Sequence, residues 1–92
     1  MKIRVKFFAT LRELFGAEEK EIELESGSDI LDLLNILCDS SRRRQMIFDN
    51  SGKLRPYIQV LKNRKPIQSL GGIHVELKEG DLVGILPPVF GG

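Results

Sequence analysis

The chain has 92 residues, of which 41% are hydrophobic, enough for one small domain with a single core and too few for a second domain. Its 14 basic and 13 acidic residues nearly cancel, which argues against nucleic acid or a membrane surface as a partner. The single cysteine, Cys38, excludes an internal disulfide, and no apolar run approaches the length of a membrane span. We therefore expect a cytoplasmic protein, and the lack of paired Cys or His ligands predicts no bound metal.

The first quarter of the chain predicts two paired strands separated by a short helix. Lys2 to Ala9 alternates, with four apolar residues on one face: Ile3, Val5, Phe7 and Ala9. Thr10 to Gly16 then reads as one or two helical turns, with Thr10 as the N-cap and Gly16 as the stop. Alternation resumes from Glu18 to Glu25, and its outer acidic row is expected to face the basic row of the first strand.

The principal helix is expected over residues 29–40, after a turn in which Ser28 is the N-cap. Asp29 and Asp32 read as charges at the start of this helix and not as a catalytic pair. Its apolar stripe has helical spacing and is widened by Leu31 and Cys38: Ile30, Leu33, Leu34 and Leu37. The cations of 42–44 are expected near its C-terminal end, where they suit the negative pole of the helix.

The second half of the chain predicts three more strands. Turn residues at 49–52 indicate a small loop or hairpin, and Tyr57–Lys62 reads as the third strand before a turn at 63–66. Residues 73–77 are expected to form a short fourth strand, in which His74 is a surface residue without a ligand partner. A Gly-Asp turn then leads into a last apolar strand that ends at Leu86.

This order of elements predicts an α+β fold, the β-grasp arrangement of ubiquitin. A mixed sheet of four to five strands would pack on one main helix, with the first and last strands as parallel neighbours at its centre. Four apolar residues fall on the face of the sheet opposite the core, where a solvent-exposed sheet normally carries polar side chains. We expect this outer face to be a partner interface, formed by Phe8, Leu61, Leu82 and Leu86.

The last six residues form a predicted tail, 87–92, on a body of residues 1–86. Pro87 and Pro88 have no N–H to donate, so the strand ladder cannot continue through them. Val89 and Phe90 follow, and then Gly91 and Gly92, whose lack of a Cβ suits a narrow channel and close approach to the terminal carboxylate. The design makes the carboxylate of Gly92 the expected functional group.

Two stretches, one at each end of the chain, resemble the small sulfur-carrier subunit of molybdopterin synthase and its relatives in the MoaD/ThiS family. They are Val5-Lys6-Phe7-Phe8-Ala9-Thr10-Leu11-Arg12-Glu13-Leu14-Phe15-Gly16 and the final thirteen residues from Gly80 to Gly92. The resemblance implies that Gly92 is adenylated by a ubiquitin-activating-like adenylyltransferase that uses ATP, and is converted to a thiocarboxylate with a sulfur donor protein. The tail would then donate sulfur to the pyranopterin precursor inside the large synthase subunit, in molybdenum or tungsten cofactor biosynthesis. Relatives commonly have a small residue where this chain has Phe90.

The chain itself carries no phosphate-binding glycine loop, because Gly71-Gly72 lacks the Lys-Ser/Thr that follows such a motif. We therefore expect a protein that is acted on, with no bound cofactor, and not an enzyme. Two alternatives use the same terminus. One is a ubiquitin-like modifier that forms isopeptide bonds through Gly92, and the other is a sulfur carrier for the thiamine thiazole or for tRNA thiolation.

Overall fold

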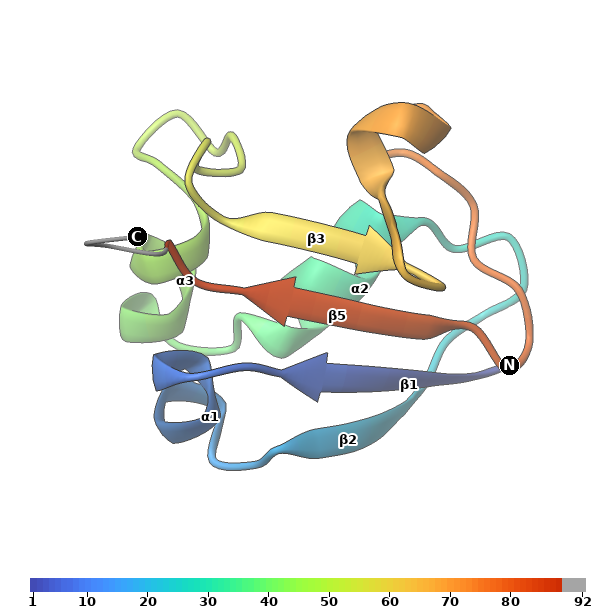
Figure 1. The fold of residues 1–92 in the computed structure, drawn as a ribbon, viewed down its shortest axis with the longest axis horizontal. Helices are drawn as coiled ribbons and strands as arrows, with labels where there is room; N and C mark the ends of the chain where they lie inside the picture. The colour runs from blue at the N-terminus through green and yellow to red at the C-terminus, as the bar shows by residue number, and fades with distance from the viewer. Residues whose placement is uncertain (89–92) are drawn as a thin grey trace.

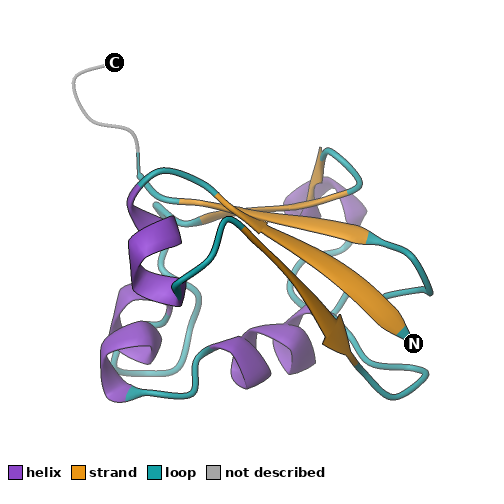
Figure 2. Ribbon diagram, turned by 90° about the horizontal axis from the view of Figure 1, so that it is seen from below, coloured by secondary structure: helices purple, strands orange, loops and turns teal. Residues whose placement is uncertain are grey.

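The computed structural model describes residues 1–88, which form one mixed sheet with helices packed on one side of it (Figures 1 and 2). Residues 89–92 lie outside the described part of the chain. The elements follow in the order β1 (Lys2–Phe7), α1 (Thr10–Phe15), β2 (Glu19–Glu23), α2 (Ile30–Leu37), α3 (Ser41–Ile47), β3 (Gln59–Lys62), β4 (Lys65–Pro66), the 3₁₀ helix η1 (Ile67–Leu70) and β5 (Leu82–Leu86). This is the predicted β-grasp architecture, with five strands.

The sheet has the strand order β2-β1-β5-β3-β4. β1 and β5 are parallel neighbours at its centre, as expected, and β1–β2, β5–β3 and β3–β4 are antiparallel. The inward residues of the strands and helices form one core of buried side chains: Ile3, Val5, Phe7, Leu11, Phe15, Leu24, Ile30, Leu33, Leu34, Leu37, Cys38, Ile47, Phe48, Ile58, Val60, Ile67, Leu77, Val83 and Ile85. Because α1, α2 and α3 all lie on this side, the opposite face of the sheet is left bare (Figure 2).

The expected helix over 29–40 is present as α2 but ends at Leu37, and a separate helix that was not predicted, α3, begins at Ser41. Cys38 leaves the helical region with φ −87° and ψ 66°, and Ser40 then caps α3 by accepting a hydrogen bond from the Arg43 N–H over 3.2 Å. Residues 42–44 belong to α3, but Arg44 still lies near the C-terminal end of α2, as expected, because its Nη2 donates to Asn35 Oδ1 over 2.9 Å.

Both predicted N-caps are displaced by one residue. Asp29, not Ser28, caps α2, and it forms a reciprocal capping box with Asp32 in which both N–H···O distances are 2.9 Å. α1 is capped by Ala9 and not by Thr10, and the chain turns there with φ 51° and ψ −128°. Ala9 is consequently exposed and does not extend the inward row of β1.

The expected strand at 73–77 is also wrong. Its backbone groups bind the start of α2: Ile30 N–H donates to Val75 O, Leu31 N–H to Ile73 O, and Leu77 N–H to Ser28 O. The fourth strand is instead β4, directly after the turn that ends β3. No helix within residues 1–88 is long and apolar enough to cross a membrane.

Candidate functional site

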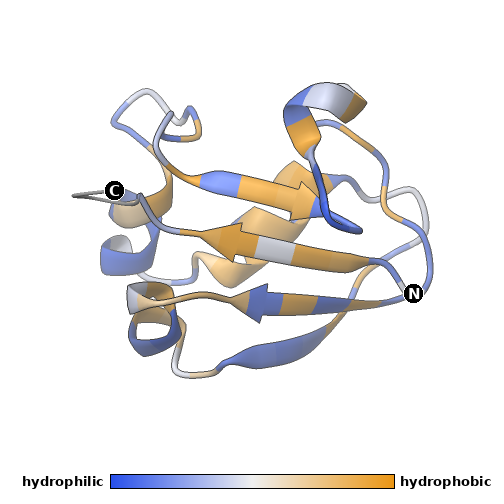
Figure 3. Ribbon diagram, viewed as in Figure 1, coloured by the Kyte–Doolittle hydropathy of each residue, from blue (hydrophilic) through white to orange (hydrophobic). Residues whose placement is uncertain are grey.

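The bare face of the sheet brings the four predicted interface residues together. In the strand register, Gly84 of β5 lies between Lys6 of β1 and Leu61 of β3. Phe8 follows β1 and stays alongside β5, because its N–H donates to Ile85 O over 3.3 Å. Phe8, Leu61, Leu82 and Leu86 are all partly exposed. Figure 3 shows β5 mostly in the apolar colour, between β1 and β3, on which polar and apolar residues are mixed.

Gly84 is the centre of this cluster. A Cβ at Gly84 would lie 3.4 Å from Phe8 Cε2 and 3.9 Å from both Leu61 Cβ and Leu86 Cδ1. The missing side chain therefore leaves a hollow of about 150 Å³, whose walls are Lys6, Phe8, Leu61, Arg64 and Leu82. Sequence reasoning missed Gly84 as a site residue, although a glycine inside an apolar strand signals close approach by another group.

Two cations border the hollow. Lys6 Nζ lies 5.7 Å from the centroid of the Phe8 ring. Glu19 is opposite Lys6 in the strand register, but its carboxylate binds Arg4 Nη2 at 3.0 Å. Within residues 1–88, neither Lys6 nor Arg64 forms an ion pair. Both charges are thus available to a partner.

The tight turn between β3 and β4 positions Arg64. Asn63 and Arg64 both have positive φ, 49° and 71°, the conformation that a two-residue hairpin turn requires. Asn63 fixes the turn to the start of β5, since its Nδ2 donates to Asp81 Oδ1 and its Oδ1 accepts from the Leu82 N–H, both over 2.9 Å. Asp81 is 8% exposed and also accepts from the Lys78 N–H over 2.8 Å. This network holds the hairpin, and with it Arg64, beside the hollow.

The predicted tail begins at the same face. β5 ends at Leu86, which pairs with Gln59, and Pro87 and Pro88 follow as partly exposed residues outside any strand. Val89, Phe90, Gly91 and Gly92 lie outside the described residues, so their functional role stays a prediction. Pro87 and Pro88, the last described residues, directly follow Leu86 of the apolar cluster.

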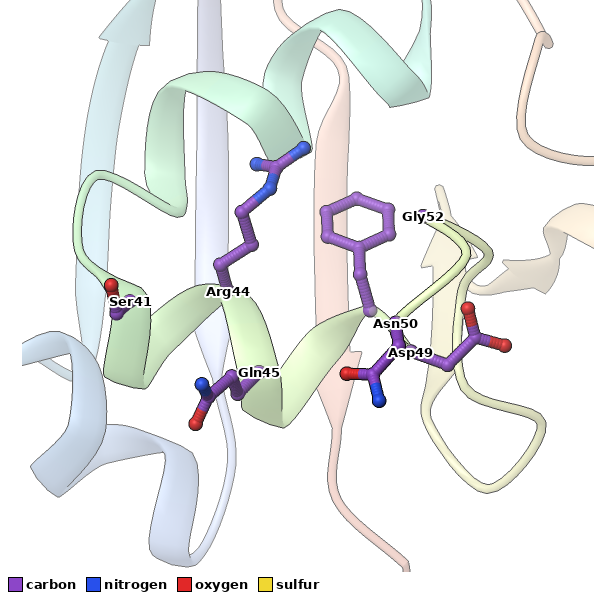
Figure 4. A pocket seen from close by; sticks show the side chains of 7 residues that line it. Ser41, Arg44, Gln45, Asp49, Asn50 and Gly52 are labelled. Atoms are coloured by element: carbon purple, nitrogen blue, oxygen red, sulfur yellow. The ribbon is translucent and has the colours of Figure 1, made fainter.

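The other polar features are separate from this face. A hollow beside α3 is lined by Ser41, Arg44, Gln45, Phe48, Asp49, Asn50 and Gly52 (Figure 4), and within it the Arg44 guanidinium stacks 4.9 Å from the centroid of the buried Phe48 ring. None of the predicted site residues that the structure describes lines this hollow.

Two sequence-based expectations concern single residues. His74 is exposed, as expected, and its Nδ1 lies 3.0 Å from Asp29 Oδ2. Cys38 is a buried core residue, as expected, and burial raises the pKa of its thiol to about 11, so it stays protonated at neutral pH. Within residues 1–88, no cluster of three His, Cys, Asp or Glu side chains is arranged to hold a metal ion.

A mixed sheet with parallel central strands, helices on one face and an apolar patch on the other defines a ubiquitin-like protein of the β-grasp class. The chain belongs to the ThiS family, whose model matches residues 5–92. It is 30% identical to small archaeal modifier protein 3 of Haloferax volcanii, over 100% of both chains.

Solved structures agree with this assignment. Small archaeal modifier protein 1 of Methanosarcina acetivorans is 37% identical with a TM-score of 0.80, and the match covers 99% of this chain and 96% of that one. A Pyrococcus furiosus protein assigned as molybdopterin converting factor, subunit 1, is 29% identical with a TM-score of 0.70, over 97% of this chain and 99% of that one. The sequence-based assignment to this family is therefore confirmed, and the chain's solved relatives are ubiquitin-like small sulfur carriers and modifiers.

Proposed function

We propose that this chain is a sulfur carrier whose working group is the carboxylate of Gly92. The observation that carries the proposal is the continuity from the central strand β5, through Pro87 and Pro88, to Gly91-Gly92 in a chain of the ThiS family. The last two residues lack side chains that would obstruct an enzyme channel or shield the carboxylate. The chain is the protein acted on, and the catalytic groups belong to its partners.

The chemistry needs activation because a carboxylate is a poor electrophile. A carboxylate oxygen of Gly92 attacks the α-phosphorus of ATP in a ubiquitin-activating-like adenylyltransferase, and pyrophosphate leaves. Hydrogen sulfide then attacks the carbonyl carbon, AMP leaves, and loss of a proton gives a thiocarboxylate. If the persulfide of a sulfur donor protein attacks instead, an acyl disulfide forms, and a thiol must then attack the donor's sulfur, forming a disulfide with it, to release the thiocarboxylate. ATP is bound by the activating enzyme and not by this chain.

The acceptor that we propose first is the pyranopterin precursor in the large subunit of a molybdopterin synthase, for a molybdenum or tungsten cofactor. Two observations support it: the motifs at both ends of the chain, and the fold shared with the Pyrococcus furiosus protein assigned as molybdopterin converting factor, subunit 1. A carrier for the thiamine thiazole or for tRNA thiolation would use the same thiocarboxylate with a different acceptor.

A second candidate function is protein modification, and the names of the modifier proteins from Haloferax volcanii and Methanosarcina acetivorans favour it. In this case the ε-amine of a target lysine attacks the activated carbonyl of Gly92. The leaving group departs, the amine loses a proton, and an isopeptide bond forms. The two functions share the activation step and differ in the nucleophile.

Intact-mass spectrometry tests the proposal. The full chain is incubated with ATP, sulfide and the adenylyltransferase from the source cells, and we expect replacement of one oxygen by one sulfur. A variant without Gly91 and Gly92 is the control, and it should melt at the same temperature but remain unmodified. An unchanged mass for the full chain would contradict the proposal. Tagged chain recovered from source cells then separates the functions: a noncovalent large subunit supports the synthase, and covalent adducts on many proteins support the modifier.

A further inference from the structure

We infer that the bare face of the sheet docks a segment of a partner protein that presents one large apolar side chain between two carboxylates. The apolar side chain sits over Gly84, and the carboxylates reach Lys6 and Arg64. The inference rests on the proposed function in one respect, because the partner would be an enzyme that uses the tail. It adds the chemistry by which such a partner is recognised.

The floor of the site fits an apolar side chain. Phe8, Leu61 and Leu86 meet around the missing side chain of Gly84, and the hollow of about 150 Å³ is more apolar than polar. Interface centres characteristically bury one large apolar or aromatic anchor in such a depression.

The rim of the site fits carboxylates. Lys6 and Arg64 both border the hollow, and neither has an acidic partner within residues 1–88. Glu19, the acid nearest to Lys6 in the strand register, is bound to Arg4. Charge complementarity across an interface mainly fixes register and partner choice, which is the role we assign to these two cations.

The same charges argue against two other occupants. A second copy docked face to face would bring Lys6 and Arg64 against the same two cations, and like charges across an interface oppose binding. A nucleic acid or anionic lipid surface would meet the exposed acidic row of β2, formed by Glu19, Glu21 and Glu23, beside the apolar floor. A protein segment with both apolar and acidic groups is the chemistry that remains.

Short peptides test this chemistry without an identified partner. In an extended peptide, side chains two positions apart share a face and are about 7 Å apart. The peptide Glu-Ser-Phe-Ser-Glu, blocked at both ends, therefore presents a ring between two carboxylates. Three controls change one property each: Glu-Ser-Ala-Ser-Glu removes the ring, Gln-Ser-Phe-Ser-Gln removes the charges, and Lys-Ser-Phe-Ser-Lys reverses them.

Each peptide is titrated into the full ¹⁵N-labelled chain and followed by amide chemical shifts. We expect the acidic phenylalanine peptide to shift the amides of Lys6, Phe8, Gly84 and Leu82, and to bind roughly tenfold more tightly than either the alanine or the glutamine peptide. The lysine peptide should cause no shifts. Added salt should weaken the acidic peptide and leave the glutamine peptide unchanged.

Variants of the chain locate the site. Gly84→Ala and Gly84→Val fill the hollow, and the nearest contact of the new Cβ, 3.4 Å, is an ordinary van der Waals distance. We expect both to keep the thermal midpoint of the wild type or raise it, since a glycine inside a strand weakens it, and both to lose peptide binding. The Lys6→Gln/Arg64→Gln double variant should lose the preference for the acidic peptide, whereas Arg42→Gln/Lys53→Gln, which removes two cations from α3 and the turn after it, should keep it.

Equal binding of all four peptides, or shifts confined to other residues, would overturn the inference. Unchanged binding to a folded Gly84→Val chain would overturn it as well. Neither result bears on the intact-mass test of Gly92, so the inference and the proposed function fail independently.

Discussion

Asn63 Nδ2 donates a hydrogen bond to Asp81 Oδ1 over 2.9 Å and so joins the β3–β4 turn to the residue that precedes β5. Asp81 is nearly buried, and it also accepts from the Lys78 N–H and lies 3.7 Å from Lys62 Nζ. One carboxylate therefore fixes both the turn that carries Arg64 and the entry to the central strand.

The first prediction concerns this carboxylate. We expect Asp81→Ala to lower the free energy of unfolding by about 1–2 kcal/mol, because it leaves two partly buried donors, Asn63 Nδ2 and the Lys78 N–H, without their acceptor. Chemical denaturation measures the change, with Glu25→Ala on the exposed surface as the control. A loss no larger than that of the control would show that the network does not stabilise the fold.

A second prediction concerns the backbone at Ala9. Its φ of 51° with ψ of −128° is a conformation that glycine adopts far more readily than alanine. Strain of this kind costs about 1–3 kcal/mol, which a glycine would remove. Glycine also makes the unfolded chain more flexible, and this lowers the gain in stability by about 0.4–1 kcal/mol. Ala9→Gly should therefore raise stability by about 1 kcal/mol. Ala17→Gly, at a position without positive φ, should lower it, and a destabilised Ala9→Gly chain would contradict the argument.

The third prediction is a pH dependence at Asp29. Partial burial raises the pKa of this carboxyl, but hydrogen bonds from the Asp32 N–H and from His74 together outweigh burial and hold the pKa below its ordinary value of 3.8. A lowered folded-state pKa contributes stability above the unfolded-state pKa, and that stability is lost as the pH falls through the folded-state value. Asp29→Asn, which can still cap a helix, should therefore flatten the loss of stability with pH below about 4. The free energy of unfolding of both proteins is measured by chemical denaturation from about pH 2 to pH 6. The same loss of stability with falling pH in both would refute this prediction.

A fourth prediction tests the outer face with a proposed partner. We expect Leu86→Lys or Phe8→Lys to weaken binding to the adenylyltransferase by about 2 kcal/mol or more, because a charge replaces an apolar anchor. Titration calorimetry measures the loss, and Ile36→Lys, at an exposed apolar position on α2, is the matched control. Unchanged affinity in both test variants would mean that this face is ordinary surface.

The fifth prediction concerns Phe90, at a position where the family resemblance implies a small residue. We expect the large subunit to hold this ring in a pocket, so Phe90→Ala should lose up to about 1.5–3 kcal/mol of binding free energy. Phe90→Leu should retain most of the affinity. Equal or tighter binding of Phe90→Ala would show that the ring is only tolerated.

The sequence by itself determined four of the strands, β1, β2, β3 and β5, and most of the inward residues on them. The alternation of Ile3, Val5 and Phe7 is a local pattern with only one register that buries it, so β1 and its core face could be read directly. The place of β1 beside β5 was expected from the β-grasp arrangement and is confirmed. The terminal motifs likewise identified the family, because they depend on residue order alone. The position of Gly16 as the left-handed stop of α1 was also predicted correctly, since few other residues adopt φ 73°.

Tertiary structure decided the features in which local alternatives are close in energy. Ser28 and Asp29 are both good N-caps, and only the contacts of Asp29 with Asp32 and His74 select between them. Residues 73–77 have strand-like composition, yet their backbone groups bind the start of α2, which lies some forty residues earlier in the chain. The hollow over Gly84 also depends on tertiary structure, because residues on or next to β1, β3 and β5 form its walls. Only the register of these three strands places their side chains around the position where Gly84 has none.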